Sequence, residues 1–211
     1  CLRRGCCGRA KVRAMACRLR LMRVTILISI LCAIPKIAYS ATLIFGPVIG
    51  TEEVNNNVSG NVYSFRSLYR RDSGITLGAV AQFGAIHSAD SDQVPDENRF
   101  EAIVGYMTTL PYSKISPYVF LSKGLRKFND KKTNVDYHTV TFGGTYRVTE
   151  KVYLDGYYKY RNTHDINWQA NIFSTGLGFG LSPQLSLQIN LGRTRGDYDS
   201  QFYDLAFTRR F

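Results

Sequence analysis

The chain has 211 residues, of which 45% are hydrophobic and 13% aromatic, and its formal net charge is +11. This length fits one domain of ordinary size, or at most two small ones. The charge is concentrated at one end, because residues 1–40 hold nine Lys or Arg and no Asp or Glu. From Ala41 onward there are 18 basic and 16 acidic residues, and all five cysteines precede Ala41. These figures exclude a basic nucleic-acid-binding body, a disulfide scaffold and a cysteine-based metal or nucleophile site in the main domain.

An export signal is predicted before Ala41. An almost wholly apolar run of eleven residues, 24–34, follows a basic segment, and Ala38 and Ser40 then place small residues before Ala41. A positive start, a short apolar run and a small-x-small cleavage site are typical of a secretory signal peptide. The run is too short to span a bilayer as a helix. We therefore expect a signal peptide over 22–40, cleaved between Ser40 and Ala41.

Residues 1–21 form a separate upstream segment. They carry seven Lys or Arg and four Cys, and Met22 follows them directly. No sustained period runs through them, so we interpret them as a spurious extension of the reading frame, with a disordered basic leader as the alternative. The predicted organisation is thus a leader at 1–21, a signal peptide at 22–40 and a single exported domain at 41–211.

The exported domain alternates with the period of two that β-strands have. In the last segment, large apolar side chains occupy alternate positions: Tyr203, Leu205, Phe207, Phe211. Polar side chains occupy positions between them: Asp204, Thr208, Arg210. The same alternation, or an extended pattern, predicts ten strands, over about 42–50, 57–70, 75–84, 99–106, 115–126, 139–148, 152–161, 173–181, 185–192 and 201–211. For 57–70 the pattern does not show which face is which.

The predicted connections alternate between short and long. Short ones lie near 71–72, 110–112, 149–150 and 182–183, whereas longer polar ones cover 51–56, 88–97, 129–133, 162–167 and 196–200. Short turns at one end and longer loops at the other are typical of outer-membrane barrels. Lipid requires a closed sheet, because an open edge has no water to satisfy it. The sequence therefore predicts an all-β, closed, antiparallel up-and-down transmembrane barrel of ten strands, with eight strands as the alternative and a soluble all-β domain as the competing interpretation.

The polar face of these strands would fill the barrel interior. Charged side chains of both signs are predicted to form a lumen-facing network: Arg99, Glu101, Asp155, Lys159, Arg161, Asp204, Arg210. The apolar face would contact lipid, with aromatic residues near the strand ends forming interfacial girdles. Because the charges nearly balance, such a network can plug the lumen, as side chains fill other small barrels. The small residues that alternate along the last strands leave room for a narrow pore instead.

The end of the chain resembles a known family. The ending Phe207-Thr208-Arg209-Arg210-Phe211 is similar to the aromatic-x-x-Arg-Phe endings of small outer-membrane barrels of the OmpA/OmpX/Ail type. This resemblance implies that Tyr203, Leu205, Phe207 and Phe211 form a C-terminal signal that the barrel assembly machinery recognises. It also implies an outer-membrane location and contact with lipid and lipopolysaccharide. OmpX-like barrels have eight strands, however, and this sequence predicts ten.

The expected function is non-enzymatic: a role in envelope integrity, or surface adhesion through the extracellular loops. A narrow porin for small solutes is the alternative. No cofactor, metal site or nucleic-acid partner is expected, and the protein is expected to be a monomer. Four basic residues in or beside the outer loops are candidates for binding lipopolysaccharide phosphates: Lys131, Lys132, Arg193, Arg195.

An enzyme at the outer rim is a remote alternative. Asp90-Ser91-Asp92 and Asp136-Tyr137-His138 resemble the Asp and His pairs of the omptin proteases, in which a His and carboxylates activate water. The alternation nevertheless places Asp136 and His138 on the outer face. Two adjacent pairs, His87-Ser88 and His164-Asp165, are a still weaker indication of a lipid-modifying hydrolase. No residue is therefore assigned a catalytic role.

Overall fold

The computed structural model describes residues 41–211, apart from 55–57, 89–96, 129–133, 164–167 and 197–198. The predicted leader and signal peptide, residues 1–40, lie outside the described residues, as does the Ser40 side of the cleavage site. The described part begins directly with a strand at Ala41. No helix long and apolar enough to cross a membrane occurs in this part of the chain.

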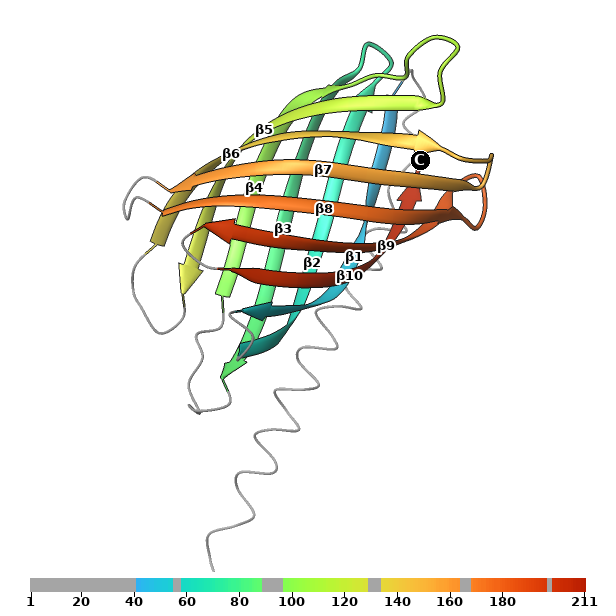
Figure 1. The fold of residues 1–211 in the computed structure, drawn as a ribbon. Helices are drawn as coiled ribbons and strands as arrows, with labels where there is room; N and C mark the ends of the chain where they lie inside the picture. The colour runs from blue at the N-terminus through green and yellow to red at the C-terminus, as the bar shows by residue number, and fades with distance from the viewer. Residues whose placement is uncertain (1–40, 55–57, 89–96, 129–133, 164–167, 197–198) are drawn as a thin grey trace, which may run out of the picture. The chain divides into compact units, whose positions relative to one another are not determined.

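Ten antiparallel strands form a closed barrel in which each strand pairs with its sequence neighbours and the first strand pairs with the last (Figure 1). The strands are β1 (Ala41–Val54), β2 (Val58–Arg71), β3 (Ile75–Ser88), β4 (Glu97–Met107), β5 (Ile115–Phe128), β6 (Asn134–Arg147), β7 (Val152–Thr163), β8 (Trp168–Gly180), β9 (Leu185–Gly196) and β10 (Ser200–Arg210). The prediction of ten strands is confirmed, and the alternative of eight is wrong.

The first strand closes the barrel. Ile49 of β1 pairs with Tyr63 of β2 on one side and with Leu205 of β10 on the other. The pairing of β1 with β10 skips Gly46 and Pro47, although Pro47 still pairs with Phe65 of β2. Proline has no N–H to donate, so it interrupts the ladder on one edge of its strand. The seam is thus complete except at this one place.

Several strands are longer than the hydrophobic pattern predicts, and the larger extensions are at the end with the longer connections. The connection predicted over 51–56 is wrong in part, because Thr51–Val54 continue β1 and remain paired with both neighbours. Similarly, β6 begins at Asn134, ahead of the predicted 139. The outward side chains of these two extensions are polar: Thr51, Glu53, Asn134, Asp136, His138. The apolar alternation therefore ends before the hydrogen-bonded ladder does. The pattern marks the apolar belt and not the strand end.

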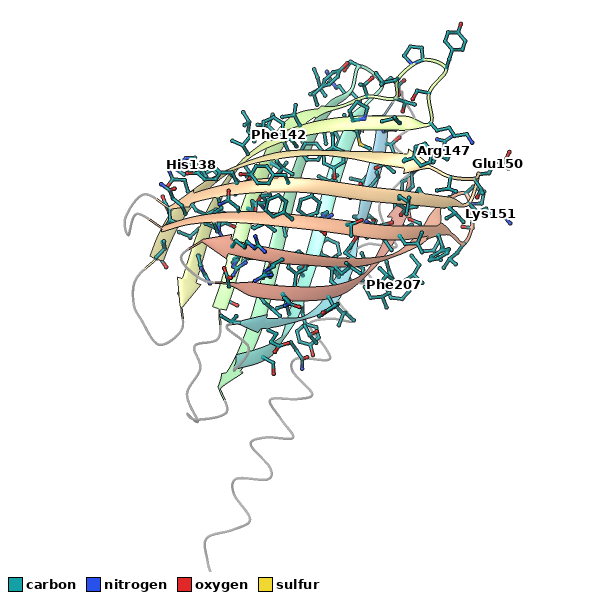
Figure 2. All side chains as sticks on the ribbon, viewed as in Figure 1. His138, Phe142, Arg147, Glu150, Lys151 and Phe207 are labelled. Carbon is teal, nitrogen blue, oxygen red and sulfur yellow. The ribbon has the colours of Figure 1, made fainter. Side chains whose placement is uncertain are left out.

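Large apolar side chains cover the outside of the barrel. Leu121, Phe142 and Ile189 lie in the middle of their strands and are 53%, 55% and 48% exposed. A water-soluble protein would bury this face, whereas lipid requires an apolar band around the barrel. Figure 2 shows Phe142 on the outer surface of β6, with Glu150 and Lys151 at the short-turn end. The direction predicted for the apolar face is therefore confirmed.

Candidate functional site

A cavity of about 220 Å³ lies inside the barrel, and residues of all ten strands line it. Since a water molecule occupies about 30 Å³ in the liquid, this volume corresponds to roughly seven waters. Polar and charged side chains predominate on the wall of β5–β7, whereas the wall of β1–β4 carries five aliphatic side chains among seven polar and charged ones. The barrel interior is the candidate functional site.

Glu101 of β4 is the centre of the most extensive polar cluster. The Lys159 Nζ of β7 lies 2.8 Å from its Oε1 and 2.9 Å from its Oε2. Ser122 Oγ donates to Oε1 at 2.5 Å, and the Tyr137 hydroxyl donates to Oε2 at 3.2 Å. Ser122 also shares a hydrogen bond with Thr139. The ion pair therefore joins two strands that are not neighbours, and the side chains of the two intervening strands support it.

A second cluster centres on Asp155 of β7. The Tyr118 hydroxyl donates to its two carboxylate oxygens at 3.3 and 3.2 Å, and Thr145 Oγ1 donates to Oδ1 at 2.9 Å. The three residues belong to β5, β6 and β7, whereas the first cluster also includes Glu101 of β4. A buried carboxylate needs several donors, and here hydroxyl groups supply them. Side chains of β5 and β6 thus donate separately to two carboxylates, one on β4 and one on β7.

The remaining carboxylates lie near the β9–β10–β1 wall. Asp204 Oδ1 accepts a hydrogen bond from Asn190 Nδ2 at 2.5 Å. Glu52 of β1 is buried and accepts from Ser200 Oγ at 2.7 Å. Glu52 is not among the residues predicted for the interior, because the strand was predicted to end at residue 50.

Most, but not all, residues of the predicted charge network lie around the same cavity. Five of its seven members line the cavity: Arg99, Glu101, Lys159, Arg161, Asp204. Arg161 is buried and lies 5.9 Å from the centre of the Tyr137 ring. Asp155 is the sixth member, and the Tyr118 that donates to it lines the cavity. Arg210 is exposed at the short-turn end of β10 and does not line the cavity.

Sequence reasoning missed Arg66 of β2, which lines the cavity. It interacts electrostatically with Asp155, Asp204 and Lys159. The faces of β2 were left open, yet Tyr63 and Tyr69 are exposed on the outside. Because these two tyrosines share odd positions, they place Arg66 on the inside. Giving aromatic residues more weight than the serines between them would have found it.

Inward aromatic rings lie on glycines of the neighbouring strand. Each of four such pairs is directly opposite in the ladder: Tyr118 with Gly143, Tyr137 with Gly124, Tyr153 with Gly178, and Phe202 with Gly192. A Cβ added at Gly178 would lie 2.0 Å from Tyr153 Cζ, and one at Gly192 would lie 2.2 Å from Phe202 Cζ. The glycines let the rings lie against the wall. This is the structural reason for the alternating small residues in the sequence.

The residues of the predicted assembly signal lie on the outer face. Tyr203 and Phe207 are 54% and 38% exposed. Phe211 stacks on Phe45 of β1 with ring centres 5.3 Å apart, and its backbone exchanges two hydrogen bonds with Leu43. The last residue of the sequence therefore fastens the β1–β10 seam, which is a structural role in addition to any recognition.

The omptin-like residues that the structure describes, Asp136 and His138, lie on the outer face of the barrel. His138 is exposed on the outer surface of β6, as Figure 2 shows, and Asp136 lies 3.9 Å from Lys123 with both side chains exposed. Asp90, Asp92 and the pair His164-Asp165 lie outside the described residues, as do Lys131 and Lys132. Arg193 and Arg195 are exposed, and Arg193 pairs with Asp199 at 3.3 Å.

No protein-family model matches the sequence, and no curated protein matches it. The structure, in contrast, is similar to solved barrels. An outer membrane channel from Pseudomonas putida F1 matches with a TM-score of 0.58 and 13% identity, over 85% of this chain and all of that one. The beta domain of the Bordetella autotransporter BrkA matches with a TM-score of 0.53 and 10% identity, over 81% of this chain and 99% of that one. The translocator domain of the autotransporter NalP from Neisseria meningitidis matches with a TM-score of 0.51 and 8% identity, over 94% and 98%. At such identities the likeness shows the fold, which is that of outer-membrane β-barrels.

Proposed function

We propose that this protein resides in the outer membrane and passes small solutes through a narrow, water-filled lumen. The observation that carries the proposal is the inward-facing Arg66, which is exposed to solvent although it lies inside the closed barrel. A barrel filled by its own side chains would bury that guanidinium. The aromatic rings that lie against glycines support the same conclusion, because they leave the centre of the lumen free.

The Glu101–Lys159 ion pair would form the narrow part of this passage. Its two side chains reach between β4 and β7, and both are largely buried, with 11% and 21% of their surfaces exposed. Such a pair limits the passage to small solutes and presents one charge of each sign. A structural role in the envelope is the second candidate, favoured by the same pair, since it also braces the lumen.

Three partners accompany the proposal. The apolar outer belt fits the hydrocarbon of a bilayer, and the exposed Arg193 and Arg195 at the loop end fit lipopolysaccharide phosphates. The outward row of Tyr203, Phe207 and Phe211 fits recognition by barrel assembly machinery. No enzymatic activity is proposed.

Two measurements test the proposal. The folded protein should fractionate with outer membranes and migrate differently on SDS gels before and after boiling; a soluble periplasmic location would contradict the membrane barrel. Purified protein in planar lipid bilayers should then give small stepwise currents. A correctly folded protein that gives no current at any voltage would contradict the channel and leave the structural role.

A further inference from the structure

We infer that the lumen favours small amphipathic anions, in which a carboxylate is attached to an apolar or aromatic body. The inference rests on the channel proposed above and names the class of solute that it would pass. Its basis is one cationic side chain, Arg66, that lies beside aliphatic residues of the lumen wall.

Five inward-facing aliphatic residues lie on four consecutive strands, with Ser64, Gln82 and Glu101 between them, and are here called the apolar strip: Val48, Val62, Leu68, Val80, Ile103. Inward faces of outer-membrane barrels are ordinarily polar. A strip of this kind contributes nothing to the passage of water or inorganic ions. It provides a contact surface for a solute that carries apolar area of its own.

Arg66 rises from this strip. Its direct partner on β3 is Val80, and Leu68 lies two positions along the same face of β2. Within the described residues, Arg66 forms no hydrogen bond and no ion pair within 4 Å, and its side chain is exposed. A guanidinium binds a carboxylate through two parallel N–H···O bonds when its donors are available. The strip and Arg66 together therefore match both parts of an amphipathic anion.

Two carboxylates that interact electrostatically with Arg66 accept hydrogen bonds from other side chains. Asp155 accepts from Tyr118 and Thr145, and Asp204 accepts from Asn190. Asp155 lies on β7, across the barrel from β2, and Asp204 lies on β10, which only β1 separates from β2. Lys159 adds a second positive charge, but Glu101 neutralises it at 2.8 Å. Val80 lies between Glu101, whose side chain is 11% exposed and paired, and Arg66, which is exposed, so the charge that a solute reaches beside Val80 is positive.

The test measures how strongly each of three small probes blocks the chloride current through single channels. Benzoate has both features, acetate has the carboxylate without the ring, and benzyl alcohol has the ring without the charge. Benzoate should half-block the current at a concentration about tenfold lower than acetate, and benzyl alcohol should not block. Equal block by benzoate and acetate would overturn the inference while leaving the channel in place.

Variants separate the two parts of the site. Arg66→Gln should raise the half-blocking concentration of benzoate about tenfold, as expected for one lost charge-assisted contact, and Arg66→Lys should recover part of the effect. Val80→Thr keeps the volume of the side chain, and should weaken block by benzoate but not by acetate. The control Lys123→Gln removes one charge from the outer face and should change neither. Unchanged benzoate block in Arg66→Gln would overturn the inference. A folded wild-type barrel that forms no channel would overturn the proposed function as well.

Discussion

The Glu101–Lys159 pair allows a quantitative prediction for stability. The two charges are 2.8 Å apart and only 11% and 21% exposed. With an effective dielectric constant of about 20, their attraction is roughly 6 kcal/mol, and much of this is offset by the cost of removing both groups from water. Because Ser122 and Tyr137 still satisfy the carboxylate, Lys159→Met should cost about 3 kcal/mol, near the lower end for broken buried pairs.

A double-mutant cycle measures the interaction itself. Glu101→Gln, Lys159→Met and their combination should give a coupling energy of about 2 kcal/mol in the free energy of unfolding. The assay is urea unfolding in lipid vesicles, followed by the fluorescence of the single tryptophan and by gel migration. The Lys123–Asp136 pair is the matched control, since its atoms are 3.9 Å apart and its side chains are 66% and 48% exposed. Its coupling should lie below about 0.5 kcal/mol. Coupling at Glu101–Lys159 as small as in the control would refute the claim that the pair is shielded from solvent.

Three further predictions concern the walls of the barrel. Gly178→Val should force the Tyr153 ring from the wall and reduce channel conductance. In the control Gly156→Ala, the added Cβ meets only an atom 3.8 Å away, so the conductance should be unchanged. Equal conductance in both variants would contradict the packing argument. Phe45→Ala should remove the stack on Phe211 and lower the free energy of unfolding by about 3 kcal/mol. The variant should then unfold at a lower urea concentration. Unaltered unfolding would show that the seam does not depend on this contact. Leu121→Arg should lower the free energy of unfolding in vesicles by about 2–4 kcal/mol, because it places a charge in lipid. Ser122→Ala removes one donor to Glu101 and should lower it by about 1 kcal/mol. A smaller loss for Leu121→Arg than for Ser122→Ala would show that Leu121 does not face lipid.

The fold could be predicted from the sequence because lipid and lumen impose opposite requirements on alternate residues. Leu185, Ile189 and Leu191 alternate with Ser186 and Asn190, so both the strand and its faces follow directly from the pattern. Where this contrast fades, prediction failed. Thr51, Glu52 and Glu53 lie beyond the apolar belt and are polar on both faces, so only the hydrogen-bonded ladder identifies them as strand.

The candidate site was harder to predict, because its contacts depend on registry around the barrel. The sequence placed Glu101 and Lys159 on the same face but not within 2.8 Å of each other, since their strands are separated by two others. Arg66 was missed because serines at positions 64 and 67 fall on both faces of β2 and weaken the alternation. The apolar strip was missed for a related reason: Val48 and Val80 lie on the face that the barrel pattern predicts to be polar.

Thiol labelling of β6 tests most directly the claim that the strands have one face to lipid and one to a water-filled lumen. The five natural cysteines are first replaced by serine, and Thr141→Cys or Phe142→Cys is then introduced into the full chain. Thr141 lines the cavity, and Phe142, its neighbour, is 55% exposed on the outer surface. With the protein in lipid vesicles, a small charged maleimide should label Thr141→Cys rapidly and leave Phe142→Cys unlabelled. Equal labelling at the two positions, or labelling of Phe142→Cys alone, would contradict the account.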